Sequence, residues 1–242
     1  MNRKNFLKTS LSIIGVSIWS ESYQNKDYPI SILLGKGNPK LYSTDLPLLK
    51  KAGFAFKEMQ RAAFKEGIEI EIVSAYRSFD RQKRIWNRKY LANQKKGLIP
   101  EENIDKIIEY STLPGTSRHH WGTDVDLIDG SKIKDGELLL TEKFHGKGPY
   151  VKMRKWLEEN AVNYGFIRPY TDDINRKGFY YEPWHYSYAP IAIPMLKRYL
   201  ELNLKSLLST QNLEGSDHLS LTFLARYREE NILGIAKGLK SF

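Results

Sequence analysis

The 242-residue chain contains no cysteine. It therefore has no lipoprotein attachment site and no disulfide framework, and a folded core must stabilise it. The sequence also lacks zinc-finger spacing, an RNP-like strand and a Gly-Lys phosphate loop, although its formal net charge is +10. Its basic residues are dispersed, which is typical of solvated helix faces. We therefore expect no nucleic acid partner.

The sequence has no apolar run long enough to span a bilayer near its N-terminus, where residues 11–19 form only a short apolar stretch. Arg3, Lys4 and Lys8 precede this stretch, which is the pattern of an export signal. We predict a signal peptide at residues 1–22, export to the periplasm or cell envelope, and no stable membrane span once the signal is removed. An uncleaved membrane tether is the alternative.

Helices and strands are expected to alternate irregularly. Apolar residues at helical spacing predict helices near residues 45–65, 80–92, 101–110, 151–163, 194–207 and 220–240. Apolar and β-branched runs predict strands near residues 68–75, 123–128, 166–169 and 179–188. This order favours an α+β fold, in which a small, mostly antiparallel sheet is flanked by helices.

The same reading divides the chain into four parts. After the signal peptide, residues 23–40 are polar and interrupted by glycine and proline, which indicates a leader segment. Residues 41–200 contain all the candidate functional residues and are expected to form the main domain. Residues 201–242 are expected to form a C-terminal helical extension, in which we identify no chemistry.

Three side chains can supply the protein ligands of a mononuclear zinc site, namely His119, Asp126 and His185. A zinc ion lowers the pKa of its water toward about 7. Glu182, three residues before His185, can take a proton from that water without being a ligand. Arg77 would face the developing oxyanion as a fixed cation. Such a set of residues can hydrolyse an amide.

Each of these residues also has an ordinary structural interpretation. His185 can be a packed histidine, Arg77 an ion-pair partner, and Glu182 a solvated residue at a strand edge beside Pro183. Asp126 is harder to explain in this way, because a carboxylate inside an apolar strand is costly to bury unless it is paired or bound to a metal. On a regular strand Glu182 and His185 would face opposite sides, so they converge only if Pro183 bends the chain.

Three segments resemble the motifs of one family. Residues 114–127, with the sequence Pro-Gly-Thr-Ser-Arg-His-His-Trp-Gly-Thr-Asp-Val-Asp-Leu, resemble the P-G-x-S-x-H-x-x-G-x-x-x-D signature of VanY-type D-alanyl-D-alanine carboxypeptidases. Residues 74–78 with Gln82 resemble that family's Y-R-S-x-x-x-Q segment, and residues 182–186 resemble its E-x-W-H block. The blocks occur in the family's order, and the resemblance covers about residues 41–200.

The family belongs to a group of zinc peptidases with structural kinship to hedgehog domains. The resemblance therefore implies a hedgehog/D,D-peptidase-like fold, with Zn²⁺ held by His119, Asp126 and His185. It implies that Glu182 is the general base and that Arg77 clamps the substrate and the oxyanion. It also implies that Ser117 and Gln82 line the substrate cleft.

Four further residues lie within or beside these motifs. Asp124 stands where relatives often carry a small apolar residue, so it either competes for the metal or points to solvent. The motif spacing selects His119 rather than His120 as the ligand, and His120 is expected behind the ligand or along the cleft. Tyr76 and Trp184 flank the motifs and are expected to line the substrate site.

The function implied by the resemblance is a zinc metallopeptidase that removes the terminal D-amino acid from peptidoglycan stem peptides by attack of water. An L,D-carboxypeptidase, a peptidoglycan endopeptidase and a non-catalytic zinc- or wall-binding module are the alternatives. A hydrolase that uses Ser117 as nucleophile is weaker, because no nucleophile elbow surrounds this serine. We expect a monomer, and the carboxylates and phosphates of a bacterial wall match its positive charge.

Overall fold

The computed structural model of the protein describes residues 28–208 and 212–242. The signal peptide predicted at residues 1–22 lies outside the described residues and stays a prediction. Among the described helices, none has both the length and the apolar character needed to cross a membrane.

The fold is built around one four-stranded sheet with the order β1-β2-β4-β3, in which all neighbouring strands are antiparallel. Its strands are β1 (Ile70–Ser74), β2 (Asp124–Asp129), β3 (Phe166–Ile167) and β4 (His185–Tyr188). In this register Asp126 of β2 lies opposite Ser74 on one side and His185 on the other. The predicted α+β class with a small antiparallel sheet is confirmed.

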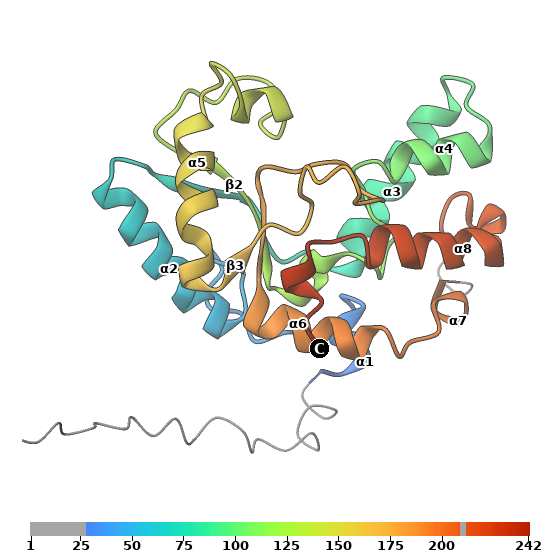
Figure 1. Ribbon diagram of the computed structural model, residues 1–242. Helices are drawn as coiled ribbons and strands as arrows, with labels where there is room; N and C mark the ends of the chain where they lie inside the picture. The colour runs from blue at the N-terminus through green and yellow to red at the C-terminus, as the bar shows by residue number, and fades with distance from the viewer. Residues whose placement is uncertain (1–27, 209–211) are drawn as a thin grey trace, which may run out of the picture.

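The two faces of the sheet differ in chemistry because successive strand residues point to opposite sides. Val125 and Leu127 of β2, with Tyr186 of β4, belong to an apolar core. This core also takes the apolar faces of helices α2 (Lys50–Lys65) and α5 (Val151–Asn160), which lie on the same side of β2 in Figure 1. Asp124 and Asp126 of β2, with His185 and Ser187 of β4, alternate with these residues and are polar, although they are buried too. One face therefore stabilises the fold and the other presents the site.

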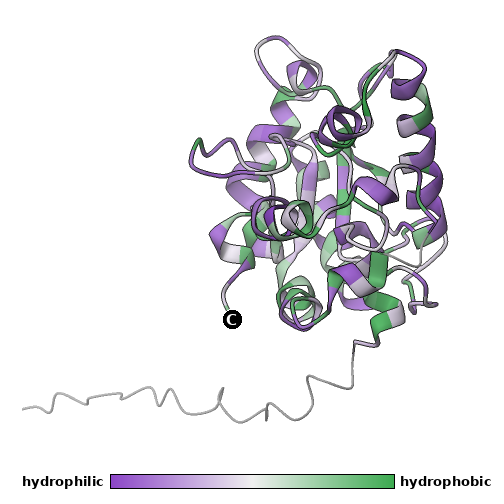
Figure 2. Ribbon diagram, turned by 90° about the vertical axis from the view of Figure 1, so that its right-hand side faces the viewer, coloured by the Kyte–Doolittle hydropathy of each residue, from purple (hydrophilic) through white to green (hydrophobic). Residues whose placement is uncertain are grey.

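A second apolar core joins the remaining helices. Figure 1 shows α3, α4 and α8 together on the side of the sheet away from α2, and Figure 2 shows that hydrophilic residues predominate on the outlying helices and loops. Ser78 caps α3 by accepting a hydrogen bond from the Arg81 backbone N–H, at 3.2 Å. The helices that contribute to this second core are α1 (Ile30–Leu33), α3 (Phe79–Gln94), α4 (Pro100–Ile107), α6 (Ala189–Tyr199), α7 (Leu204–Leu208) and α8 (Leu221–Tyr227).

Four predicted elements differ from the structure. The helix expected at residues 45–65 begins only at Lys50. The strand expected at residues 179–188 begins only at His185, because the chain turns at Pro183. The helix expected at residues 194–207 is two helices. The first, α6, begins at Ala189, since Pro190 in its first turn already favours a helix start, and it contains Pro194 and ends at Tyr199, while α7 follows at Leu204–Leu208. The helix expected at residues 220–240 breaks into α8, a π-helical turn and a 3₁₀ turn. A Cβ at Gly234 would meet the Glu230 carbonyl, so the chain packs back on itself there.

The C-terminal residues pack against the segment that leads to the histidine motif. The Tyr227 hydroxyl of α8 accepts a hydrogen bond from the Leu113 N–H (3.1 Å) and lies 2.8 Å from the Thr116 hydroxyl. On the same segment, the Gly115 carbonyl accepts a hydrogen bond from the Tyr199 hydroxyl at 2.8 Å. The Trp86 indole of α3 donates to the Glu214 carbonyl at 3.0 Å. The predicted boundary between the main domain and the C-terminal extension, at residue 200, stays a prediction. Helix α8 shares a core with α3 and α6.

We expect Tyr227→Phe to lower the free energy of unfolding by about 1–3 kcal/mol, because the buried Leu113 N–H loses its acceptor. Tyr110→Phe is the matched control, since the Tyr110 side chain is 47% exposed, and it should change stability little. Urea denaturation followed by circular dichroism measures both. Equal stability of the two variants would show that this bond does not anchor the C-terminal helices.

Candidate functional site

His119, Asp126 and His185 come together on the polar face of the sheet, all buried. Each offers one ligand atom, and these atoms lie within 4.8 Å of one another. Asp126 and His185 come from the facing strands β2 and β4, and His119 comes from the 3₁₀ turn η1 (Arg118–Trp121) that precedes β2. Among the described residues, this is the one group of three or more His, Cys, Asp or Glu side chains placed so that it could hold a metal ion. The three predicted ligands are thus brought together.

Backbone contacts place the η1 turn beside the sheet. Gly122 ends the turn with a φ of +66°, a left-handed conformation that favours glycine. Its carbonyl accepts a hydrogen bond from the Leu49 N–H at 2.7 Å. The His119 carbonyl accepts one from the Arg77 N–H at 3.0 Å. The turn is therefore tied to the N-terminus of α2 and to the segment after β1.

The hydrogen bonds of His119 and Asp126 leave atoms free for a cation. His119 Nδ1 donates to the Ala75 carbonyl at 2.9 Å, so Nε2 keeps its lone pair, 3.4 Å from Asp126 Oδ2. Asp126 Oδ1 is buried and has no hydrogen-bond partner among the described residues. Burial alone raises the pKa of Asp126, but nearby His119, His185 and Arg77 hold it below its usual range. A buried carboxylate oxygen without a donor, flanked by two imidazoles, fits a zinc ion.

His185 lies between two further carboxylates. Its Nε2 lies 3.0 Å from Asp124 Oδ1, and its Nδ1 lies 2.8 Å from Glu182 Oε2 and 3.8 Å from Asp126 Oδ1. Burial alone lowers the pKa of His185, but the bonds to Asp124 and Glu182 raise it to about 10. Glu182 reaches Nδ1 because the chain turns at Pro183, where the His185 N–H donates to the Glu182 carbonyl at 3.2 Å. The bend that the sequence required at Pro183 is therefore present.

Asp124 does not point to solvent, so this one of the two alternatives predicted for the residue was wrong. Its side chain is fully buried and accepts hydrogen bonds from Arg118 Nε (3.0 Å), the Thr123 hydroxyl (2.6 Å) and the Ser187 hydroxyl (2.9 Å). Burial raises the pKa of Asp124, yet Arg118 and His185 hold it well below its usual range. Arg118 was not predicted from the sequence as a site residue. Because a buried aspartate on a strand requires a buried cation as partner, the position of Asp124 in a predicted strand could have indicated such a residue.

Arg77 is held in place from two sides. Its Nη1 donates to Gln82 Oε1 at 2.8 Å, its Nη2 donates to the Ser74 hydroxyl at 3.1 Å, and its Nη2 lies 3.9 Å from Asp126 Oδ2. Burial lowers the pKa of Arg77, but a guanidinium keeps its charge at neutral pH. Gln82 is fully buried behind Arg77 and donates to the Thr112 carbonyl at 2.8 Å. Direct contact between Gln82 and a substrate stays a prediction.

His120 points away from the three ligand candidates and supports the backbone around them. Its Nδ1 donates to the Arg77 carbonyl at 2.6 Å, and its Nε2 accepts from the Gly115 N–H at 3.0 Å. Burial lowers the pKa of His120 to about 4, so the ring is neutral at pH 7, as the acceptor role of Nε2 requires. His120 thus joins two motif segments, which matches the expectation that it lies behind the ligand.

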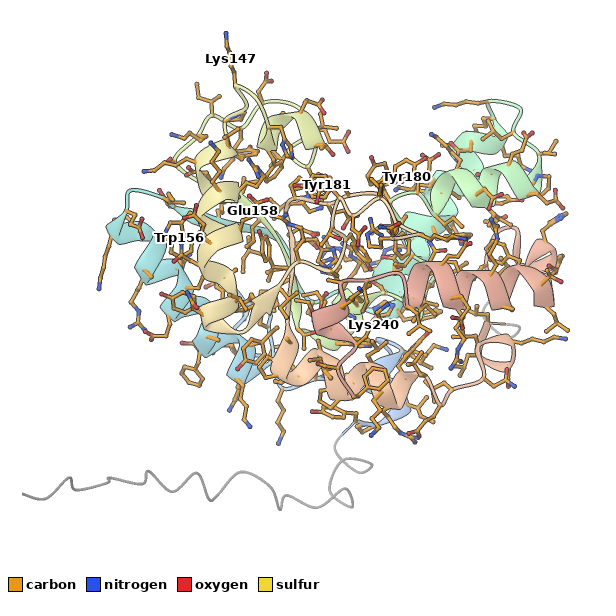
Figure 3. All side chains as sticks on the ribbon, viewed as in Figure 1. Lys147, Trp156, Glu158, Tyr180, Tyr181 and Lys240 are labelled. Atoms are coloured by element: carbon orange, nitrogen blue, oxygen red, sulfur yellow. The ribbon has the colours of Figure 1, made fainter. Side chains whose placement is uncertain are left out.

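The three ligand candidates open onto a cleft of about 880 Å³. Figure 3 shows Tyr180 and Tyr181 on the loop before Glu182, between the α5 side and the α4 side of the molecule. Tyr76 is not brought to this cleft. It lies in a separate hollow, where its hydroxyl donates to the Gly37 carbonyl at 3.3 Å. The residues that line the cleft include the motif residues Arg77, Ser117, Arg118, Glu182 and Trp184, and also Lys89, Tyr110, Glu137 and Glu142.

Comparison with known sequences points to one family. A family model described as "VanY: D-alanyl-D-alanine carboxypeptidase" matches residues 46–191. The Bacillus subtilis protein YodJ is 36% identical over 143 residues, which is 58% of this chain and 45% of that protein. A D-alanyl-D-alanine carboxypeptidase of Enterococcus faecalis is 30% identical over 152 residues, which is 62% of this chain and 51% of that protein. This chain thus spans about half the length of these curated relatives.

Comparison of folds gives the same result. The structure of VanYB in complex with D-alanine-D-alanine is 25% identical, with a TM-score of 0.51, and the match covers 73% of this chain and 92% of that chain. A vancomycin-resistance D,D-pentapeptidase VanY in complex with Zn(II) is also 25% identical, with a TM-score of 0.50 over 71% of this chain and 89% of that chain. The predicted hedgehog/D,D-peptidase-like fold is thereby confirmed.

Zinc titration tests the candidate ligand group. We expect the protein to bind one equivalent of zinc, and His119→Ala and His185→Ala to lose it, because each removes one of three ligands. His218→Ala is the control, since His218 is exposed and contacts Glu101 at 3.0 Å. Metal analysis after dialysis measures the stoichiometry. Full zinc content in either ligand variant would contradict the assignment.

Proposed function

The chain belongs to the VanY family of D-alanyl-D-alanine carboxypeptidases, and from this premise we propose that it is a zinc-dependent carboxypeptidase. Its substrate would be a peptidoglycan stem peptide, from which it hydrolyses the terminal D-amino acid. The observation that carries the proposal is Asp126 Oδ1, a buried oxygen without a hydrogen-bond partner in the described chain. Nε2 of His119, which keeps its lone pair, lies beside this carboxylate, and Nδ1 of His185 lies 3.8 Å from Oδ1.

His119, Asp126 and His185 would hold the zinc ion in this proposal. Two nitrogen donors and one carboxylate form one of the ligand sets that catalytic zinc sites use. A zinc ion in such a site acts as a Lewis acid and makes water acidic enough to become a nucleophile near neutral pH. The Zn(II) complex of a VanY relative supports the choice of metal.

Glu182 would act as the general base. Its carboxylate lies 2.8 Å from Nδ1 of His185, so it is beside the ligand group without belonging to it. It also lines the cleft, where a water or a peptide can reach it. A carboxylate in this place can accept the proton of the attacking water and pass it to the leaving amine.

Arg77 would stabilise the negative charge that develops on the scissile carbonyl oxygen. Gln82 and Ser74 hold its guanidinium in a fixed orientation, so little rearrangement is needed when that charge appears. Its side chain is 17% exposed and lines the cleft, which gives a substrate access to the charge. Asp126 lies close enough to keep Arg77 beside the ligand group.

The cleft has the features expected for a small peptide end. Ser117 and Trp184 line it, which supports their predicted place in substrate binding. The VanYB complex with D-alanine-D-alanine supports the choice of ligand class. We propose that residues 41–200 form the catalytic domain, that residues 201–242 brace it, and that the protein is exported to the cell envelope. The monomeric state stays a prediction.

Mass spectrometry of stem-peptide digests tests the proposed function. We expect the purified protein to release one D-alanine from the pentapeptide, to lose this activity with a chelator and to regain it with zinc. Release of D-alanine from the tetrapeptide instead would indicate the L,D specificity. Cleavage of cross-linked wall alone would indicate an endopeptidase. Zinc binding without any cleavage would support a binding module and contradict the proposal.

Glu182→Gln tests the general base. We expect kcat to fall by about 10²–10⁴-fold with full zinc content, because the base is lost and the ligands are kept. Glu137→Gln and Glu142→Gln are matched controls, because both residues line the same cleft, and both should keep most activity. Activity and metal content are measured on the same samples. Normal turnover in Glu182→Gln would contradict the role of Glu182 as general base.

The same assay on Ser117→Ala tests the alternative in which Ser117 is the nucleophile of a serine hydrolase.

A further inference from the structure

Two aspartates stand two residues apart on the polar face of β2, and their surroundings differ. Asp126 Oδ1 has no hydrogen-bond donor among the described residues. Both oxygens of Asp124 accept hydrogen bonds, Oδ1 from Arg118 and His185 and Oδ2 from Thr123 and Ser187. Asp124 therefore has no oxygen left for a metal, while Asp126 does.

The contact with Asp124 identifies Nε2 as a protonated nitrogen of His185. An ionised carboxylate only accepts hydrogen bonds, so His185 Nε2, at 3.0 Å from Asp124 Oδ1, must be the donor. The other nitrogen, Nδ1, faces Glu182 Oε2 and Asp126 Oδ1. Nδ1 is therefore the nitrogen of His185 that faces the candidate ligand Asp126, while Nε2 donates to Asp124.

Asp124 is itself held rigidly. Arg118 donates from Nε to Asp124 Oδ1 and from Nη2 to the Ser187 hydroxyl at 2.6 Å. Ser187 lies directly opposite Asp124 in the register of β2 and β4, and its hydroxyl donates to Asp124 Oδ2 at 2.9 Å. The Arg118 guanidinium also lies over the Trp121 ring, 4.9 Å from its centroid. All four residues are at least about nine-tenths buried, so water does not compete for these bonds.

We propose that Asp124, held by Arg118 and Ser187, is a positioning residue that keeps the proton on Nε2 of His185 and presents Nδ1 to the metal. The inference rests on the proposed function, because it assumes that His185 is a zinc ligand. A carboxylate that accepts the second N–H of a ligand histidine orients the ring and increases its basicity. Asp124 is therefore expected to raise zinc affinity without contacting the metal.

Zinc affinity, measured by competition with a chromophoric chelator, is the main test. We expect Asp124→Ala to weaken zinc binding about 100-fold and Asp124→Asn about tenfold, since Asn keeps an acceptor but loses the charge. The matched control is Asp129→Asn, because Asp129 is a fully buried aspartate of the same strand that hydrogen-bonds Ser131 rather than a histidine. It should bind zinc as tightly as the unchanged protein.

A second measurement separates positioning from general stability. In ¹⁵N-histidine NMR spectra of the zinc-loaded protein, we expect the Nε2 proton of His185 to exchange slowly with water, and faster in Asp124→Asn. Circular dichroism and urea midpoints without metal show whether each variant folds, and Asp124→Asn decides the question if Asp124→Ala does not fold. Unchanged zinc affinity and unchanged proton exchange in folded Asp124→Asn would overturn the proposal.

The outcome also distinguishes this inference from the proposed function. If the unchanged protein binds no zinc, both fail together. If it binds zinc and cleaves stem peptides while the Asp124 variants bind zinc equally well, the proposed function stands and only the role of Asp124 is refuted.

Discussion

The antiparallel register of β2 with β1 and β4 is the constraint on which the site depends. It sets Asp126 opposite both Ser74, which holds Arg77, and His185. A shift of one residue in this pairing would turn Asp126 toward the apolar core of α2 and α5, where a carboxylate has no partner. The Val125 and Leu127 contacts on that core face therefore stabilise the fold and at the same time hold the ligand group in register.

The charges of the site are nearly balanced within the described protein. Three buried carboxylates, Asp124, Asp126 and Glu182, face two permanent cations, Arg77 and Arg118. The remaining negative charge keeps His185 protonated without metal, as its raised pKa indicates. A divalent cation would take over this compensation, since its charge exceeds that of the proton that it replaces. Charge balance and the ligand set thus favour the same occupant.

The C-terminal segment is part of this arrangement because it contacts the loop before the histidine motif. The Tyr199 hydroxyl donates to the Gly115 carbonyl, and the Tyr227 hydroxyl accepts from the Leu113 N–H and lies against the Thr116 hydroxyl. His120 in turn joins Gly115 to Arg77. The helices after residue 188 therefore hold the loop that leads to His119. Their tyrosine hydroxyls contact this loop rather than the cleft, which explains why their sequence carries no recognisable catalytic chemistry.

The hydrophobic periodicities of the sequence by themselves predicted the α+β class, because they are local properties. The sequence predicted the grouping of His119, Asp126, His185, Glu182 and Arg77 through the resemblance of three motifs to one family, since local spacing cannot join residues from three separate segments. The tertiary structure decided how the neighbouring polar residues are used. Asp124 and Asp126 have the same side chain on the same strand face. They differ because Arg118, Thr123, His185 and Ser187 donate to both oxygens of Asp124, while Asp126 Oδ1 has no donor among the described residues. Tyr76 and Gln82 also belong to the motif beside Arg77, yet the fold turns Tyr76 into another hollow and buries Gln82 behind Arg77. Such differences depend on contacts between residues far apart in the chain, and no local pattern contains them.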